Sequence, residues 1–243
     1  NRKIEDLRFF EFGNCYHYNP DKKDEDCPIN AYAEETHLAL WLTGKRVSGS
    51  WIHPDESTSF YELRAYVQNI LRRVGMPQGM LVMEKTDNNV FSNGVVLKNR
   101  GGKSFVEMGI VSTALLKQND IDVPVFYADL HWDNIVKAVR KSVVSFKEIS
   151  KYPSVSRDLA LLLDNEIEFE QVERVAFQSE KKLLKKVELF DVYQGDKLPV
   201  GKKSYAVNFV LQDEQATLND KKIDAIMSKL IANLKKQLGA ELR

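Results

Sequence analysis

The sequence has little cysteine and no long apolar run. Only 2 of its 243 residues are cysteines, Cys15 and Cys27, so it lacks the disulfide framework that stabilises small secreted domains. No stretch reaches the ~18 apolar residues of a membrane-spanning helix, and no signal peptide opens the chain. We therefore expect a cytoplasmic protein with no membrane partner. Because Asn1 is not an initiator methionine, we also expect a piece of a longer chain.

Charge of either sign is not in excess. The chain carries 35 Lys+Arg and 35 Asp+Glu, and residues 151–243 carry 16 and 15. This balance excludes a general polyanion binder, so we expect no DNA partner. With 43% hydrophobic residues, the chain is long enough to form one large domain or two ordinary ones, each with a core.

The cysteines and histidines form no known zinc motif. Cys15 and Cys27 lie twelve residues apart, with His17 and His37 nearby, and together these side chains could offer four ligands. Their spacing, however, lacks the close pairs typical of zinc sites. The sequence therefore favours ordinary reduced thiols and no metal site.

Residues 1–150 predict an α+β module on an antiparallel or mixed sheet. Apolar side chains recur at helical spacing in 59–75, with Ser57 or Ser59 as the N-cap and Gly75 as the stop. Short helices are expected at 112–120 and 132–140, and strands at 8–18, 36–43, 79–85, 94–102, 104–111 and 123–130. Because strands and helices do not alternate regularly, a parallel sheet is not expected.

Residues 151–243 follow a connector, "SKYPSVS", and predict a ferredoxin-like domain. The expected elements are a strand at 157–164, a helix at 169–180, hairpin strands at 183–193 and 203–213, a helix at 219–239 and a short final strand. In this β-α-β-β-α-β order both helices cover one face of the sheet and leave the other open. The open face is a place to look for ligand binding.

Alternation along 203–213 separates the two faces of the second hairpin strand. The core side carries Tyr205, Val207, Phe209 and Leu211. Ser204, Ala206 and Asn208 have the opposite parity and should lie on the open face. Their side chains are small and polar, which leaves room for a flat base.

The first hairpin strand changes parity partway along. Val187 and Leu189 set one apolar side, whereas Phe190 sets the other. This change implies a single-residue β-bulge near Leu189. Beyond the bulge, Asp191 and Tyr193 should face outward.

Asp191, Tyr193 and Ser204 together suit an unpaired guanine. A carboxylate can accept the two adjacent donors of guanine, N1–H and N2–H₂, while the ring stacks and the hydroxyl adds a hydrogen bond. From the residues alone, a second interpretation is equally good, in which Asp191 caps a turn and Tyr193 packs on the loop. Four lysines could hold phosphates at this end of the domain, namely Lys186, Lys197, Lys202 and Lys203.

Long segments of the chain resemble the bacterial phenylalanyl-tRNA synthetase β-subunit family. "YPSVSRDLALLLD", "ELFDVYQGDKLPVGKKSYAVNFVLQDEQATLND" and "LGAELR" closely resemble its C-terminal ferredoxin-fold anticodon-binding domain. "RFFEFGNCY", "LWLTGKR", "FYELRAYVQNIL" and "GIVSTALLK" with "VPVFYADL" are similar to its catalytic-like core module. The resemblance implies a class II synthetase-like core at 1–150 followed by an anticodon-binding domain at 151–243.

The same resemblance implies what each part does. The core module would have no catalytic residues and would pair with an α subunit in an α₂β₂ heterotetramer, a tRNA ligase in which α carries out the aminoacylation chemistry. The holoenzyme would use ATP and Mg²⁺, with no cofactor in this fragment. The second domain would bind the anticodon of tRNA(Phe), which begins with guanine, and the family positions matching Asp191, Tyr193 and Ser204 contact the anticodon.

Two segments of the first module offer weaker catalytic patterns. "NRGGKSF" at 99–105 lacks the helix and trailing Arg of a class II ATP site, so it predicts a glycine turn. "WIHPDES" around His53 is more typical of a turn and cap than of acid–base catalysis. The alternatives to the RNA-binding interpretation are a ferredoxin-like regulatory module for a small metabolite and a self-sufficient enzyme built on His53.

Overall fold

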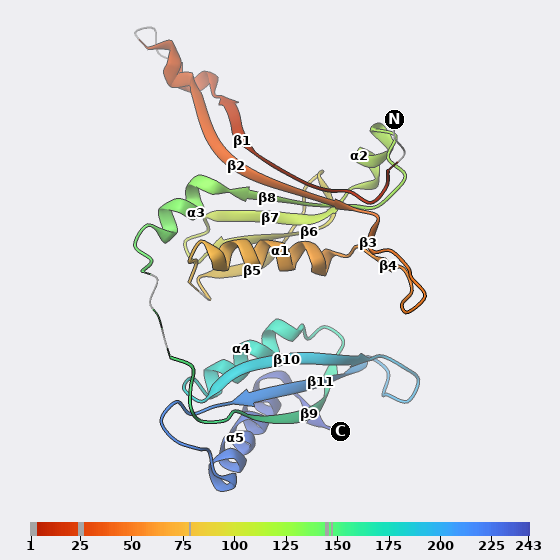
Figure 1. Cartoon of the computed structure of the whole chain (residues 1–243), viewed down its shortest axis with the longest axis vertical. Coiled ribbons are helices and arrows are strands. Elements are labelled where there is room, and N and C mark those ends of the chain that lie inside the picture. Colours follow the sequence, from red (N-terminus) through yellow and green to blue (C-terminus); the bar gives the residue numbers. More distant parts are fainter. Residues whose placement is uncertain (1–3, 24–26, 78, 144–145, 147) are drawn as a thin grey trace. The chain divides into compact units, whose positions relative to one another are not determined.

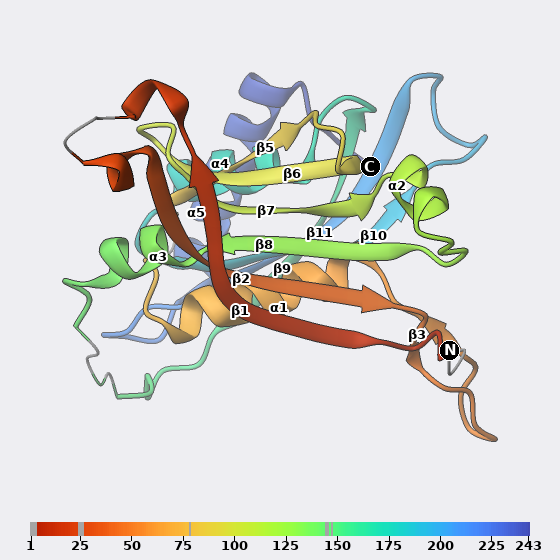
Figure 2. The ribbon, with the colours of Figure 1, turned by 90° about the horizontal axis from the view of Figure 1, so that it is seen from above.

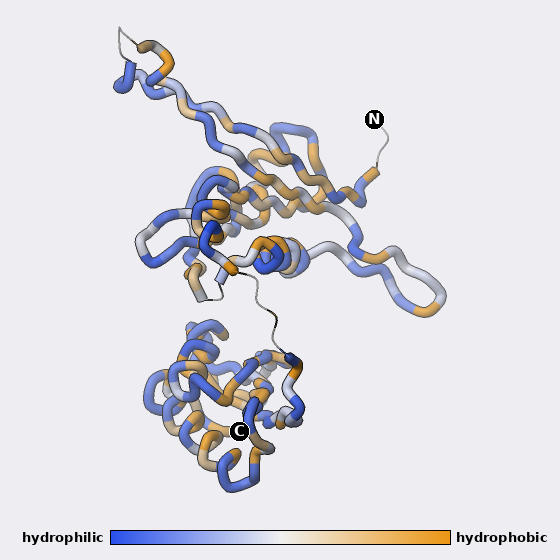
Figure 3. The backbone as a smooth tube through the Cα atoms, turned by 60° about the vertical axis from the view of Figure 1, so that its left-hand side comes forward, coloured by the Kyte–Doolittle hydropathy of each residue, from blue (hydrophilic) through white to orange (hydrophobic). Residues whose placement is uncertain are grey.

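The computed structural model describes residues 4–23, 27–77, 79–143, 146 and 148–243. The chain forms two compact units, Asn1–Ser145 and Phe146–Arg243. Each unit has its own sheet and hydrophobic core, and hydrophobic segments, orange in Figure 3, occur in both. Among the helices of the described residues, none is both long and apolar enough to cross a membrane.

The first unit is built on a six-stranded antiparallel sheet, ordered β1-β2-β8-β7-β6-β5 (Figures 1 and 2). Its strands are β1 (Arg8–Tyr18), β2 (Tyr32–Thr43), β5 (Leu81–Thr86), β6 (Phe91–Asn99), β7 (Ser104–Val111) and β8 (Val125–His131). A separate ribbon pairs β3 (Lys45–Val47) with β4 (Glu56–Ser57). The helices are α1 (Phe60–Arg73), α2 (Thr113–Gln118) and α3 (Trp132–Val139), with 3₁₀ turns η1 (Pro20–Lys22) and η2 (Pro28–Ala31). The predicted antiparallel sheet is confirmed.

Helices α1 and α3 cover one face of this sheet. Ser59 caps α1 by accepting a hydrogen bond from the backbone N–H of Glu62, which confirms one of the two expected caps. The core shared by the helices and the sheet includes Leu40, Leu63, Val67, Leu71, Met108, Leu130 and Ile135. In Figure 2 the sheet is seen from the opposite face, with α1 behind it.

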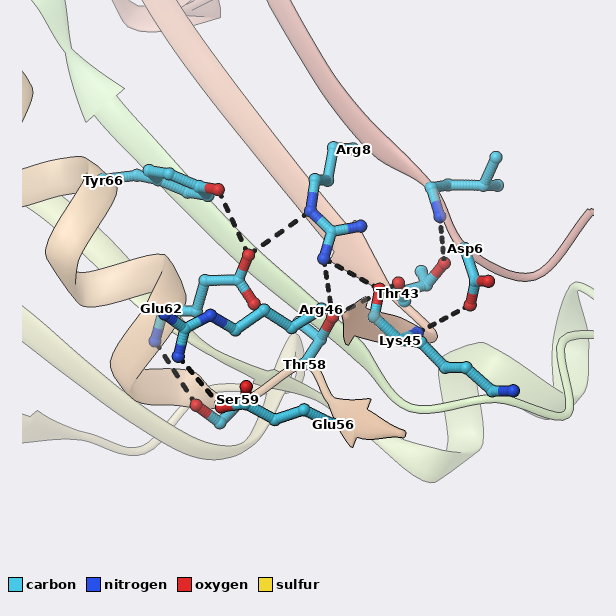
Figure 4. A network of polar contacts seen from close by, with 11 residues as sticks. Asp6, Arg8, Thr43, Lys45, Arg46, Glu56, Thr58, Ser59, Glu62 and Tyr66 are labelled. Atoms are coloured by element: carbon cyan, nitrogen blue, oxygen red, sulfur yellow. Dashed lines mark hydrogen bonds and ion pairs between the residues drawn. The ribbon is translucent and has the colours of Figure 1, made fainter. Parts of the chain in front are cut away.

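A polar network ties the edge strand β1 to α1 (Figure 4). Arg8 Nε lies 3.3 Å from Glu62 Oε1, and the Tyr66 hydroxyl donates to the same oxygen at 3.2 Å. The Arg8 guanidinium also donates to the Lys45 carbonyl at 2.9 Å and to Thr58 Oγ1 at 3.4 Å. Because the Glu62 carboxylate is buried, its charge depends on these partners.

The second unit has a four-stranded antiparallel sheet, ordered β10-β11-β9-β12. Its elements are β9 (Val155–Asp164), α4 (Phe169–Ser179), β10 (Leu184–Tyr193), β11 (Lys202–Leu211), α5 (Asp220–Leu238) and β12 (Glu241–Leu242). The chain order and the sheet order together are those of the ferredoxin-like fold, as the sequence predicts.

Helices α4 and α5 pack on the same face of this second sheet. Their apolar sides share a core with β9 and β11 that includes Leu161, Val172, Val207, Phe209, Ile223 and Leu230. Asn219 caps α5, and Gly239, with φ +64°, ends it in the left-handed conformation. Residues of opposite parity on β9, β10 and β11 therefore lie on the face away from the helices.

Candidate nucleic-acid interface

The bulge predicted near Leu189 is confirmed by the register of β10 and β11. Leu189 pairs with Val207, but Asp191 pairs with Ala206, so Phe190 is the extra residue. Tyr193 then pairs with Ser204. Because the neighbouring Tyr205 lies in the core, Ser204 and Tyr193 lie on the face away from the helices. The bulge is the reason that Asp191 and Tyr193 leave the core side of the sheet.

A hollow of about 470 Å³ lies on this open face. It is lined by Ala160, Asp191, Tyr193, Lys197, Ser204, Ala206 and Arg243. Ala160 and Ala206 are paired across β9 and β11, so two methyl groups form its floor. The small floor between polar walls leaves space for a flat ligand such as a nucleobase.

Arg243 is a lining residue that the sequence reasoning missed. It follows β12, and its backbone N–H donates to the Ala160 carbonyl at 3.0 Å. Its guanidinium carbon lies 5.4 Å from the ring centroid of Tyr193, within cation–π range. The ferredoxin strand order places the last strand beside β9, and that order is the signal that could have identified Arg243.

Tyr193 depends on a glycine in the hairpin loop. A Cβ atom on Gly195 would lie 2.6 Å from the Tyr193 hydroxyl oxygen, so any larger residue would displace the ring. Tyr193 remains 36% exposed, which leaves part of the ring available to a ligand. The glycine therefore helps to set the position of the aromatic side chain.

Several predicted residues lie outside this hollow. Asn208 is on the open face, but its amide donates to Asp158 Oδ1 at 2.6 Å. Lys186 Nζ lies 2.5 Å from Glu188 Oε1. Lys202 pairs with Asp164 at 2.9 Å and lines a second hollow, of about 420 Å³, formed with the 194–201 loop. Of the four predicted lysines, only Lys197 lines the first hollow.

Lys203 is placed differently from our expectation of a phosphate contact. It has the parity of Tyr205, so its side chain lies on the core side and is only 6% exposed. Its ammonium donates to the Asn165 carbonyl at 2.8 Å and lies 4.7 Å from the Tyr205 ring centroid. Because its ammonium is buried and already bonded, Lys203 is poorly placed for a phosphate contact.

The open face of the first unit carries aromatic rings and carboxylates. The ring of Tyr127 stacks between Trp41 and Phe91, at centroid distances of 5.3 and 6.0 Å. Burial raises the pKa of the Tyr127 phenol well above its ordinary value, and the charge of Asp129 adds to the shift. Glu107 and Asp129 are paired directly across β7 and β8.

The two weaker catalytic patterns lie in a turn and in an exposed loop. Residues 100–102 form the turn between β6 and β7, where the Asn99 side chain accepts hydrogen bonds from the backbone of Gly101 and Lys103. His53 lies in the exposed loop between β3 and β4, with Nδ1 3.3 Å from the Pro54 carbonyl. The neighbouring Asp55 pairs with Lys45, and this ion pair lowers the Asp55 pKa. The predicted glycine turn is confirmed.

Two family models match the chain. Residues 1–132 match the model described as "Phenylalanyl tRNA synthetase beta chain CLM domain", and residues 150–243 match "Ferredoxin-fold anticodon binding domain". The first match lies within the predicted segment 1–150, and the second begins one residue before the predicted segment 151–243.

Similar proteins carry a matching description. The phenylalanine–tRNA ligase β subunit of Bacteroides fragilis is 54% identical over 243 residues, covering 100% of this chain and 30% of that protein. The corresponding β subunit of Porphyromonas gingivalis is 44% identical over 242 residues, again covering 100% and 30%. That of Syntrophotalea carbinolica is 30% identical over 238 residues, covering 98% and 29%. The chain thus spans about 30% of the length of these relatives.

Proposed function

This chain belongs to the phenylalanyl-tRNA synthetase β-subunit family, and we propose that it binds the anticodon of tRNA(Phe) within a cytoplasmic phenylalanine–tRNA ligase. The observation that carries this proposal is the hollow bounded by Asp191, Tyr193 and Ser204, with its alanine floor. The matched anticodon-binding family favours RNA over a small regulatory metabolite as the ligand of the second unit.

In this proposal, Asp191 selects guanine at the first anticodon position. Its carboxylate accepts hydrogen bonds from N1–H and N2–H₂, which only guanine presents side by side. Tyr193 stacks on the base, and Ser204 adds a polar contact. Lys197 and Arg243 are the cations at the rim that can approach a phosphate.

We also propose that the first unit is a class II synthetase-like core that supports a catalytic α subunit. Edge strand β1 is exposed along its whole length, and its Phe10 and Tyr16 are 76% and 72% exposed. An exposed row of aromatic residues suits a protein partner. ATP and Mg²⁺ would act in the α subunit of the α₂β₂ assembly, so this chain alone should show no ATP–pyrophosphate exchange with phenylalanine.

The test is binding of anticodon stem-loops by fluorescence polarisation. The loop that begins with guanine should bind better than the same loop with adenine, by about 1–3 kcal/mol or roughly fivefold to 150-fold if the carboxylate contact resembles other bidentate base contacts. Asp191→Asn should remove this preference, since an amide cannot accept both donors.

The matched control is Asp196→Asn. Asp196 lies in the loop of the hairpin whose strand β10 carries Asp191, but it lines the second hollow, so its change should leave the guanine preference intact. Equal binding of the two loops by the unmodified chain, or an unchanged preference in Asp191→Asn, would refute guanine recognition by this residue.

A further inference from the structure

A second cluster of polar side chains lies on the first sheet, on the face away from α1. His17 comes from β1, and Glu35 and His37 come from β2. The register pairs Gly13 with His37 and Cys15 with Glu35. His17 alternates with Gly13 and Cys15 along β1, so its side chain lies on the same face of the sheet as those of Glu35 and His37. One ligand atom from each of His17, Glu35 and His37 lies within 4.8 Å of the other two.

His37 holds a buried nitrogen that has no hydrogen-bond partner in the part of the chain that the structure describes. Its Nδ1 lies 2.7 Å from Asp129 Oδ1 on β8, and because an ionised carboxylate can only accept, Nδ1–H is the donor. In the neutral ring, this bond leaves the lone pair on Nε2. Nε2 is buried with no hydrogen-bond partner among the described residues, and the side chain is 11% exposed. Leaving a buried polar atom unpaired costs about 1–3 kcal/mol.

The spacing around that nitrogen suits a metal ion. Glu35 Oε2 lies 3.6 Å from His37 Nε2, which is too long for a hydrogen bond. Two ligand atoms bonded to a tetrahedral zinc ion at about 2.0–2.2 Å are about 3.3–3.6 Å apart. The gap therefore fits an ion between the two atoms. The ring of His131 packs against that of His37, with 4.7 Å between the ring centroids, and this contact helps to hold the His37 ring in place.

We propose that His17, Glu35 and His37 bind one zinc-like divalent ion, with water completing its coordination. Two imidazoles and one carboxylate suit Zn²⁺, whereas Mg²⁺ and Ca²⁺ prefer oxygen ligands alone. Asp129 is a positioning residue, because its bond to Nδ1 orients the ring and sets the tautomer.

The spacing of cysteines and histidines could not reveal this cluster. Neither Cys15 nor Cys27 belongs to the group of potential ligands found among the described residues. One ligand is a glutamate, and the histidines are brought together by pairing of β1 with β2. The proposal thus replaces our expectation that the chain holds no metal.

The test uses the full chain, freed of metal with a chelator and titrated with Zn²⁺ in a calorimeter. One ion should bind per chain. His17→Ala should weaken binding at least tenfold, and the exposed position of His17 on an edge strand makes a folding defect unexpected. Asp129→Asn should weaken binding by about 10–100-fold through its effect on His37.

His53→Ala is the matched control, because His53 is exposed and lies outside the cluster. The His53→Ala chain should bind Zn²⁺ with the same affinity as the unmodified chain. Substitution with Co²⁺ should give the intense visible absorption of four-coordinate cobalt, and this band should be lost in His17→Ala. Absence of saturable binding, or equal affinity of His17→Ala and His53→Ala, would overturn the proposal.

Discussion

Lys197 and Lys203 lie on the same hairpin, but their side chains have opposite environments. Lys197 lines the hollow on the open face, whereas the ammonium of Lys203 is held on the core side by the Asn165 carbonyl. Strand parity accounts for the difference, because Lys203 alternates with Ser204 and shares the face of Tyr205. Lysines counted in a sequence are therefore not equivalent as phosphate contacts.

Lys197→Ala and Lys203→Met are expected to separate RNA binding from stability. Lys197→Ala should weaken binding of both guanine and adenine stem-loops alike and reduce the salt dependence of binding by about one phosphate contact. Lys203→Met should instead destabilise the second unit by about 1–3 kcal/mol, since the Asn165 carbonyl loses its donor. Polarisation at several salt concentrations and denaturant unfolding measure the two effects. The assignment would be wrong if the two variants exchanged these phenotypes.

Tyr193→Ala is expected to weaken stem-loop binding by about 1–3 kcal/mol, because a stacking surface is lost. Stacking does not depend strongly on base identity, so the guanine and adenine loops should lose similar affinity. Tyr193→Phe keeps the ring and serves as the control. Comparable losses for Phe and Ala in polarisation measurements would show that the hydroxyl, and not the ring, is responsible.

At the scale of elements, the bulge in β10 sets the open face. Without an extra residue, Phe190 would pair with Ala206, and Asp191 would have the parity of the core. The bulge leaves Phe190 61% exposed instead. This feature was predictable because apolar alternation within a single strand records the change of parity.

The link between β1 and α1 gives a stability prediction at the same scale. Arg8→Met should destabilise the first unit by about 1–3 kcal/mol, because Glu62 would keep a buried carboxylate with fewer donors. Thermal or denaturant unfolding of the first unit measures the loss.

Glu62→Gln provides the second arm of a double-mutant cycle. Introduced into the Arg8→Met chain, it removes the unpaired charge and should restore part of the lost stability. Strictly additive losses in the two single variants and the double variant would contradict a direct coupling between Arg8 and Glu62.

At the scale of the whole molecule, each unit has a hydrophobic core of its own. Leu63→Ala should therefore destabilise the first unit and Leu230→Ala the second, each by about 2–5 kcal/mol, since both leucines are fully buried. Backbone hydrogen exchange, read in β7 and in β11 of the whole chain, measures the two units separately. A single leucine variant that accelerated exchange equally in both sheets would contradict separate cores.

Much of the first unit was predictable at the level of strands and helices, but its face chemistry was not. The α1 pattern and its Ser59 cap are local features, since they depend on residues within a few turns of the chain. The grouping of His17, Glu35 and Asp129 around His37 depends on three strands that are distant in sequence. Periodicity within one segment carries no information about such neighbours.

The sequence by itself determined the ferredoxin-like order, the bulge near Leu189 and the outward parity of Asp191, Tyr193 and Ser204. These features follow from alternation and turn chemistry along short segments. Only the tertiary structure decided that Arg243 reaches the same hollow and that Lys203 is engaged elsewhere. Both depend on contacts between residues far apart in the chain, and such contacts are set by sheet order and register rather than by local pattern.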